Sequence, residues 1–160
     1  MVVDLIHSGE VNLTRWLPYL PSRGRYAQSK QRRVRRWLGN SRINIHKLYK
    51  SLIRAALADW RDGCLYLSLD TSLFWDQYCL IRIAVVHRRR ALPMAWRVLH
   101  HRSATVAFND YKAVVNQAVQ CIPTDVKVVL LSDRGFAHPA LMRALTQQWQ
   151  WRYRIRLKKD

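Results

Sequence analysis

Residues 128–139 read VVLLSDRGFAHP, an aliphatic run that ends abruptly in polar residues. A continuous aliphatic run is typical of a strand that is buried on both faces inside a sheet. Ser132 and Asp133 follow this run, and Gly135 is expected to give the backbone freedom for a turn. We therefore expect a central strand that carries a carboxylate at its carboxyl end.

A second strand with the same ending is predicted at residues 64–70, CLYLSLD, where alternate leucines share one face and Asp70 ends the run. Residues 78–87 and 90–99 read as two further strands joined by a polar turn. Residues 64–99 are therefore predicted to form a three-stranded antiparallel meander.

The remaining elements alternate between helix and strand. Apolar residues recur at helical spacing over residues 106–121, and Pro139 suits the first turn of a second helix. Residues 149–157 alternate between apolar and polar side chains, as in a half-exposed strand. The order strand, strand, strand, helix, strand, helix, strand predicts an α/β fold with a ribonuclease H-like mixed five-stranded sheet and flanking helices. In such a sheet the first strand is central and the fourth pairs beside it.

Residues 1–61 are predicted to be a basic helical N-terminal segment, followed by the sheet-containing core at residues 62–160. Between positions 23 and 36 seven basic residues occur with no acidic one: Arg23, Arg25, Lys30, Arg32, Arg33, Arg35 and Arg36. A second helix is expected over residues 45–60, with a basic stripe of Lys47, Lys50 and Arg54. These residues are predicted to contact DNA phosphates, although a basic stripe is also typical of a solvated helix face.

The overall charge points to a polyanionic partner. The net charge is +18, while 49% of residues are hydrophobic and seven are tryptophan, so the chain is expected to fold around a core. We favour nucleic acid as the partner. The alternative interpretations of the charge are a ribosome-type structural protein and a protein that binds an anionic membrane surface. Three widely spaced cysteines favour a reducing compartment, and no apolar stretch is long enough to cross a bilayer. We therefore expect a cytoplasmic, nucleoid-associated protein.

Acidic residues are scarce, so the placement of Asp70 and Asp133 is informative. The predicted topology makes their strands neighbours, and two adjacent carboxylates repel each other unless they share a proton or a cation. Mg²⁺, with Mn²⁺ as a substitute, is the expected cofactor for phosphodiester chemistry at such a pair. Arg134 is placed to reach a phosphate or an acidic neighbour. The alternative is that Asp133 caps a helix and Asp70 belongs to an ordinary turn.

The chain resembles the DDE transposases of bacterial insertion sequences, in particular the insertion-sequence-4 type. The resemblance rests on LYLSLDTSLFW at residues 65–75, on VVLLSDRGFAHPALMRAL at residues 128–145 and on WQWRYRIRLK at residues 149–158. It implies that Asp70 and Asp133 are the first two members of a catalytic, metal-binding triad. It also implies cleavage and strand transfer on double-stranded DNA at transposon ends and a target, with a homodimer as one expected arrangement.

The third acid of the family pattern is missing. In the family it is a Glu on a helix that follows the last strand, whereas the single glutamate here is Glu10. Tyr153, Arg156 and Asp160 imitate the spacing of the motif, but the alternation of residues 149–157 places the first two on a strand. We therefore expect a truncated transposase with reduced or no activity. A non-catalytic DNA-binding protein and a ribonuclease H-like nuclease or resolvase are the alternatives.

Overall fold

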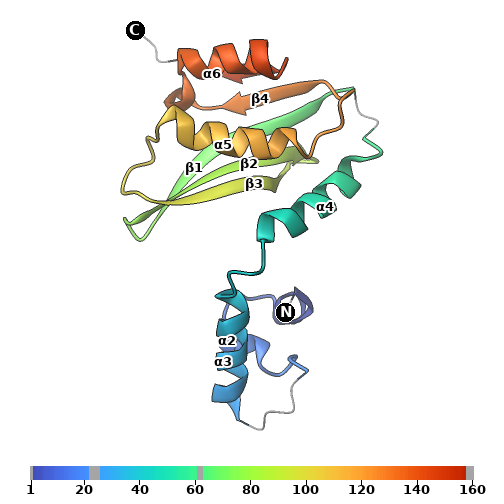
Figure 1. Ribbon diagram of the computed structural model, residues 1–160, viewed down its shortest axis with the longest axis vertical. Coiled ribbons are helices and arrows are strands. Elements are labelled where there is room, and N and C mark those ends of the chain that lie inside the picture. The colour runs from blue at the N-terminus through green and yellow to red at the C-terminus, as the bar shows by residue number, and fades with distance from the viewer. Residues whose placement is uncertain (1, 22–25, 61–62, 158–160) are drawn as a thin grey trace. The chain divides into compact units, whose positions relative to one another are not determined.

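A five-stranded mixed sheet forms the centre of the larger of two units of the chain (Figure 1). Its strands are β1 (Leu65–Phe74), β2 (Tyr78–His87), β3 (Arg90–His100), β4 (Val128–Ser132) and β5 (Arg152–Ile155), in the spatial order β3-β2-β1-β4-β5. β1, β2 and β3 pair antiparallel, whereas β4 pairs parallel with β1 and β5 pairs parallel with β4. The predicted mixed sheet, with its antiparallel meander and central first strand, is confirmed.

The computed structural model describes residues 2–21, 26–60 and 63–157, with side chains from residue 5 onward. The chain divides into two compact units, Met1–Asn44 and Ile45–Asp160. The division falls at the start of α4 (Ile45–Leu57), so this helix belongs to the unit with the sheet, whereas the sequence grouped it with residues 1–61. Contacts with the sheet explain the grouping, because the Tyr49 hydroxyl donates to the Pro93 carbonyl at 2.7 Å and Leu57 is buried in the core.

One face of the sheet, which we call the covered face, packs against helices. On β1 it carries Leu65, Leu67 and Leu69, none of which is more than 2% exposed. The helix α5 (Phe108–Val119) lies across this face (Figure 1). Each fully buried leucine contributes about 1.5–3 kcal/mol of transfer free energy. The core therefore fixes which alternate residues of every strand point inward.

The opposite face, which we call the open face, corrects one prediction for β4. This strand is internal to the sheet as expected, and Val128 and Leu130 are buried at 3% and 0% exposure on the covered face. Val129 and Leu131, on the open face, are only half-buried. The prediction of burial on both faces is wrong, because a groove in the described structure lies over Val129.

β1 also differs from its prediction, since it does not end at Asp70. The strand runs on to Phe74, because the hairpin with β2 continues beyond the point at which β4 stops. Trp75 and Asp76 close this hairpin with φ values of 51° and 52°. Two successive residues in the left-handed region are typical of the tight turns that match the twist of antiparallel strands. Asp70 is therefore an internal strand residue.

The two predicted helices of the sheet unit are confirmed. α5 buries Tyr111, Val114, Val115 and Ala118, as its helical spacing indicated. The helix α6 (Pro139–Arg143) continues into a π-helical turn, η2 (Ala144–Gln148), and Leu141 and Leu145 are fully buried. Both helices contribute to the same core as the covered face of the sheet.

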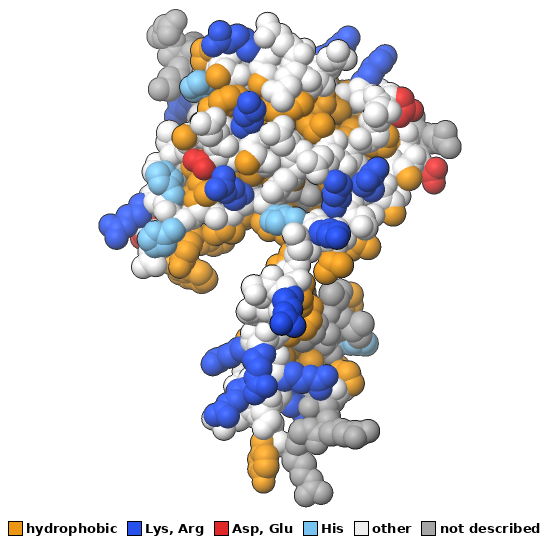
Figure 2. Space-filling model, in the orientation of Figure 1, with side chains coloured by type: hydrophobic (Ala, Val, Ile, Leu, Met, Phe, Trp, Pro, Cys, Tyr) orange, Lys and Arg blue, Asp and Glu red, His pale blue; other side chains and the backbone are white. Residues whose placement is uncertain are grey.

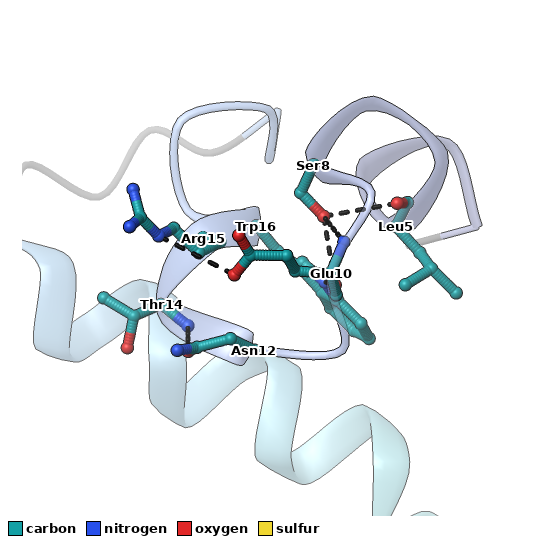
Figure 3. Close-up of polar contacts among 7 residues, drawn as sticks. All are labelled: Leu5, Ser8, Glu10, Asn12, Thr14, Arg15 and Trp16. Carbon is teal, nitrogen blue, oxygen red and sulfur yellow. Dashed lines mark hydrogen bonds and ion pairs between the residues drawn. The ribbon is translucent and has the colours of Figure 1, made fainter.

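The described part of the N-terminal unit contains three helices, α1 (Val2–Ser8), α2 (Leu13–Trp16) and α3 (Ala27–Leu38). Asn12 caps α2 by accepting a hydrogen bond from the Thr14 N–H at 3.0 Å, and the Trp16 indole donates to the Glu10 carbonyl at 2.6 Å (Figure 3). Trp16 and Val34 are buried at 6% and 1% exposure. These contacts give the short helices a small core of their own.

Candidate functional site

The parallel pairing of β1 and β4 brings the two candidate aspartates to adjacent positions in the sheet. The last paired residues are Leu69 on β1 and Ser132 on β4, and Asp70 and Asp133 directly follow them in the chain. Neighbouring strands lie about 5 Å apart, so the two backbones are close at this point. The side chains, however, have different partners.

Asp70 lies on the open face and pairs with a cation. It is directly opposite Arg82 in the antiparallel register of β1 and β2, and the Arg82 Nη2 atom lies 3.6 Å from Asp70 Oδ2. The Asp70 side chain is 54% exposed. A loose, solvated ion pair of this kind contributes little to stability and leaves the carboxylate accessible.

Asp133 caps the short helical turn η1 (Arg134–Phe136). Its Oδ1 atom accepts a hydrogen bond from the Gly135 N–H at 2.9 Å. A Cβ atom added at position 135 would lie 3.1 Å from this same oxygen, which is tighter than ordinary contact. The glycine is therefore explained by the close approach of the capping carboxylate. Asp133 remains exposed to solvent.

A small hollow of about 150 Å³ lies beside Asp133. It is lined by Thr71, Ala104, Thr105, Val106, Asp133, Gly135 and Phe136. The Thr71 hydroxyl donates to the Ala104 carbonyl at 3.1 Å, which ties β1 to the loop that precedes α5. Asp70 does not line the hollow. The structure thus places the two aspartates where the pairing of β1 with β4 ends, but only Asp133 lines this cavity.

Phe136 and His138, which follow Asp133 in the chain, help to hold the segment after β4 in place. Phe136 is 4% exposed and packs edge-on against Tyr111 at 5.5 Å between ring centroids. Arg134 is exposed. His138 caps α6 by accepting from the Ala140 N–H at 3.2 Å and stacks on Phe108, so it has a structural role.

No described group of three or more His, Cys, Asp and Glu side chains is arranged to hold a metal ion. The donors available at the sheet edge are the carboxylate oxygens of Asp70 and Asp133, which are of the hard type that Mg²⁺ prefers. Mg²⁺ commonly keeps several water ligands and takes only one or two protein carboxylates. The donor set therefore fits a weakly held, hydrated ion.

The predicted DNA-binding residues of α3 fall into two groups. The Lys30 ammonium donates to the Leu17 carbonyl at 3.3 Å, and Arg33 donates to the Pro21 carbonyl at 3.2 Å, so these two side chains help to hold the N-terminal unit together. Arg32, Arg35 and Arg36 are exposed and share one face of the helix. Figure 2 shows Lys and Arg side chains gathered along this helix. Arg23 and Arg25 lie outside the described residues.

The basic residues of α4 have contacts within the sheet unit. The Lys50 ammonium donates to Gln120 Oε1 at 2.8 Å. Burial raises the pKa of the Cys121 thiol, and the charges of Lys50 and Arg54 partly offset this increase. Lys50 and Arg54 therefore lie near the C-terminal end of α5, where cations are stabilised by the helix dipole. Lys47 is exposed.

Sequence reasoning missed the arginines of the open face. Arg82 pairs with Asp70, and the register places Arg152 beside Val129 and Arg154 beside Leu131. Arg156 lies just beyond the end of β5, and its backbone N–H donates to the Ser132 carbonyl at 3.2 Å. The alternation of residues 149–157 was the signal, but the sequence alone did not show that this row of arginines shares a face with Asp70.

Neither a protein-family model nor a curated protein sequence matches this chain. In the described part of the chain, no helix is both long and apolar enough to span a membrane.

Proposed function

We propose that this chain is a DNA-binding transposase core with a ribonuclease H-like fold, related to the DDE transposases, in which Asp70 and Asp133 form an incomplete metal site. The observation that carries the proposal is the parallel register of β1 and β4, which makes these two aspartates the next residues after the Leu69–Ser132 pair. The strand order and the net charge of +18 support the same function.

The side chains at this edge have distinct roles in the proposal. Asp70 and Asp133 supply oxygen ligands, and Asp133 is oriented by its hydrogen bond from Gly135. Arg82 offsets the charge of Asp70, and exposed Arg134 contacts a DNA phosphate. When bound, Mg²⁺ or Mn²⁺ supplies Lewis-acid activation for attack on a phosphodiester. Two carboxylates without a third described partner are expected to hold the ion weakly.

Metal binding tests this proposal directly. Mn²⁺ binding to the full chain can be measured by water-proton relaxation. The affinity should fall by more than about tenfold in Asp70→Asn and in Asp133→Asn, because loss of even an outer-shell partner lowers metal affinity by about that factor. Asparagine preserves side-chain shape, and it also preserves the cap at position 133. Asp125→Asn removes an exposed carboxylate from a turn and should leave binding unchanged. Equal Mn²⁺ affinity in all four proteins would contradict the proposal.

A non-catalytic DNA-binding protein is the second candidate, and one observation favours it. Asp70 is paired with Arg82 and Asp133 caps η1, so each carboxylate already has a structural partner. In this case duplex affinity would depend on Arg32, Arg35 and Arg36, and plasmid DNA incubated with Mn²⁺ would not be nicked. Asp70-dependent nicking of a plasmid would exclude this candidate.

A further inference from the structure

The open face of the sheet contains a basic groove. It lies at the amino ends of β1 and β4, whereas the candidate carboxylates lie beyond the last residue pair of these two strands. It is lined by residues from the amino ends of β1 and β4 and from β5, and its volume is about 540 Å³. Pockets of roughly 300–1,000 Å³ accommodate ligands of small-molecule size. The residues that the argument uses are Cys64, Tyr66, Lys127, Arg152 and Arg154, all of which line the groove.

The charge of the groove selects an anionic ligand. Lys127, Arg152 and Arg154 are all exposed, and none of the described residues that line the groove is acidic. Arg152 and Arg154 lie two positions apart on one strand, so their side chains leave the same face at a spacing of about 7 Å. Guanidinium groups bind phosphate oxygens through paired hydrogen bonds. A regular row of arginines is suited to a ligand with repeated phosphates.

The aromatic residue in the groove narrows the ligand class. Tyr66 is 47% exposed, and the register places it beside Val129, which is beside Arg152 on the next strand. An exposed ring next to arginines is a combination that binds a base by stacking and the backbone by charge. Bases of a duplex are stacked on one another and are not available to such a ring, whereas those of a single strand are.

We propose that this groove binds single-stranded nucleic acid, with one base stacked on Tyr66 and flanking phosphates on Arg152 and Arg154. Ser68 and then Asp70 follow Tyr66 on the same face of β1, so the strand would continue from the groove toward Asp70. The inference relies on nucleic acid being the partner, as in the proposed function, and does not depend on metal binding.

Cys64 provides a readout that is specific to the groove. It is a free, partly exposed cysteine in the groove lining, whereas the other two cysteines are buried. Iodoacetamide labelling of Cys64 in the full chain, followed by mass spectrometry, should be slowed by a twelve-nucleotide oligothymidine, by about tenfold at ten times the Kd. A duplex of the same length should not protect Cys64.

Variants identify the contacts. Tyr66→Ala should raise the oligonucleotide concentration for half-protection about tenfold, within the range for loss of one stacked base, while Tyr66→Phe should retain protection. Arg152→Gln/Arg154→Gln should reduce the slope of log affinity against log salt by about 1.4, because each single-strand phosphate contact contributes about 0.7. Arg90→Gln/Arg143→Gln, which removes the same charge elsewhere on the sheet unit, is the matched control. Labelling rates without oligonucleotide correct for any change in Cys64 itself.

The outcomes separate this inference from the proposed function. Equal changes of the salt slope in Arg152→Gln/Arg154→Gln and in the control Arg90→Gln/Arg143→Gln would contradict nucleic-acid binding in the groove, even if the chain still binds DNA through α3. Equal protection by the duplex would overturn the single-strand assignment. Loss of Cys64 protection in Asp70→Asn would contradict the claim that groove binding is independent of the carboxylates. Weaker Mn²⁺ binding with unchanged Cys64 protection would support binding of the oligonucleotide in the groove.

Discussion

The covered face and the open face of the sheet are made from alternate residues of the same strands, yet they have different compositions. On β1 the covered face carries Leu67, which is fully buried, while the neighbouring open-face residue Tyr66 is 47% exposed. On β5 the open face carries Arg152 and Arg154. Because side chains alternate strictly along a strand, residues that bind a ligand can vary on one face without disturbing the core on the other.

The largest expected difference between the faces lies within β4. Leu130→Ala should lower the free energy of unfolding by about 3–5 kcal/mol, because it leaves a cavity in the core. Leu131→Ala, one residue further, should cost only about 1 kcal/mol, because this half-buried side chain loses less apolar contact. Urea unfolding of both variants measures the difference, and equal losses would show that the open face is also a packed interface.

A pH titration sharpens the same comparison. Burial raises the pKa of Tyr111 above its ordinary value of 10.0. An unfolded tyrosine then loses its proton at lower pH than the folded one, so stability is fully present below pH 10 and is lost as pH rises through the folded pKa. Tyr111→Phe should lessen the alkaline loss of stability in urea titrations between pH 8 and 11. Tyr66→Phe on the open face is the control, and an identical effect of both would contradict this account.

The smallest expected effect belongs to the ion pair of the open face. The coupling free energy between Asp70 and Arg82 should be below about 1 kcal/mol, because the 3.6 Å contact is solvent-exposed. A double-mutant cycle with Asp70→Asn and Arg82→Gln measures this coupling. A value of several kcal/mol would mean that Asp70 has mainly a structural role, which favours the non-catalytic candidate.

Periodicity was sufficient to predict the covered face. The leucines at positions 65, 67 and 69 identify β1 as a strand with one buried face, and the spacing of Tyr111, Val114 and Ala118 identifies α5. The strand order followed from the sequence of elements, because short connections and right-handed crossovers leave few arrangements. These features depend on local pattern and on general topological rules.

Other features depend on contacts between distant residues and could not be predicted. The end of β1 is set by pairing with β2, so Asp70 gave a misleading signal as a polar residue after a leucine run. The aliphatic run of β4 resembled a strand buried on both faces, although Val129 faces the groove. The hydrogen bond from Lys50 to Gln120, across 70 residues of sequence, is likewise invisible in a helical pattern.

β5 is an outer strand of the sheet as described, and its arginines have a consequence for association between molecules. An unpaired outer strand can recruit a strand from another chain, which leads to aggregation. Arg152 and Arg154 on β5, together with Arg156 just beyond its end, place repeated positive charge at this strand, so two copies that approach through it repel each other. Salt weakens that repulsion, because the Debye length falls from about 30 Å at 0.01 M to about 8 Å at 0.15 M. The colloidal stability of the protein should therefore be highest in dilute buffer.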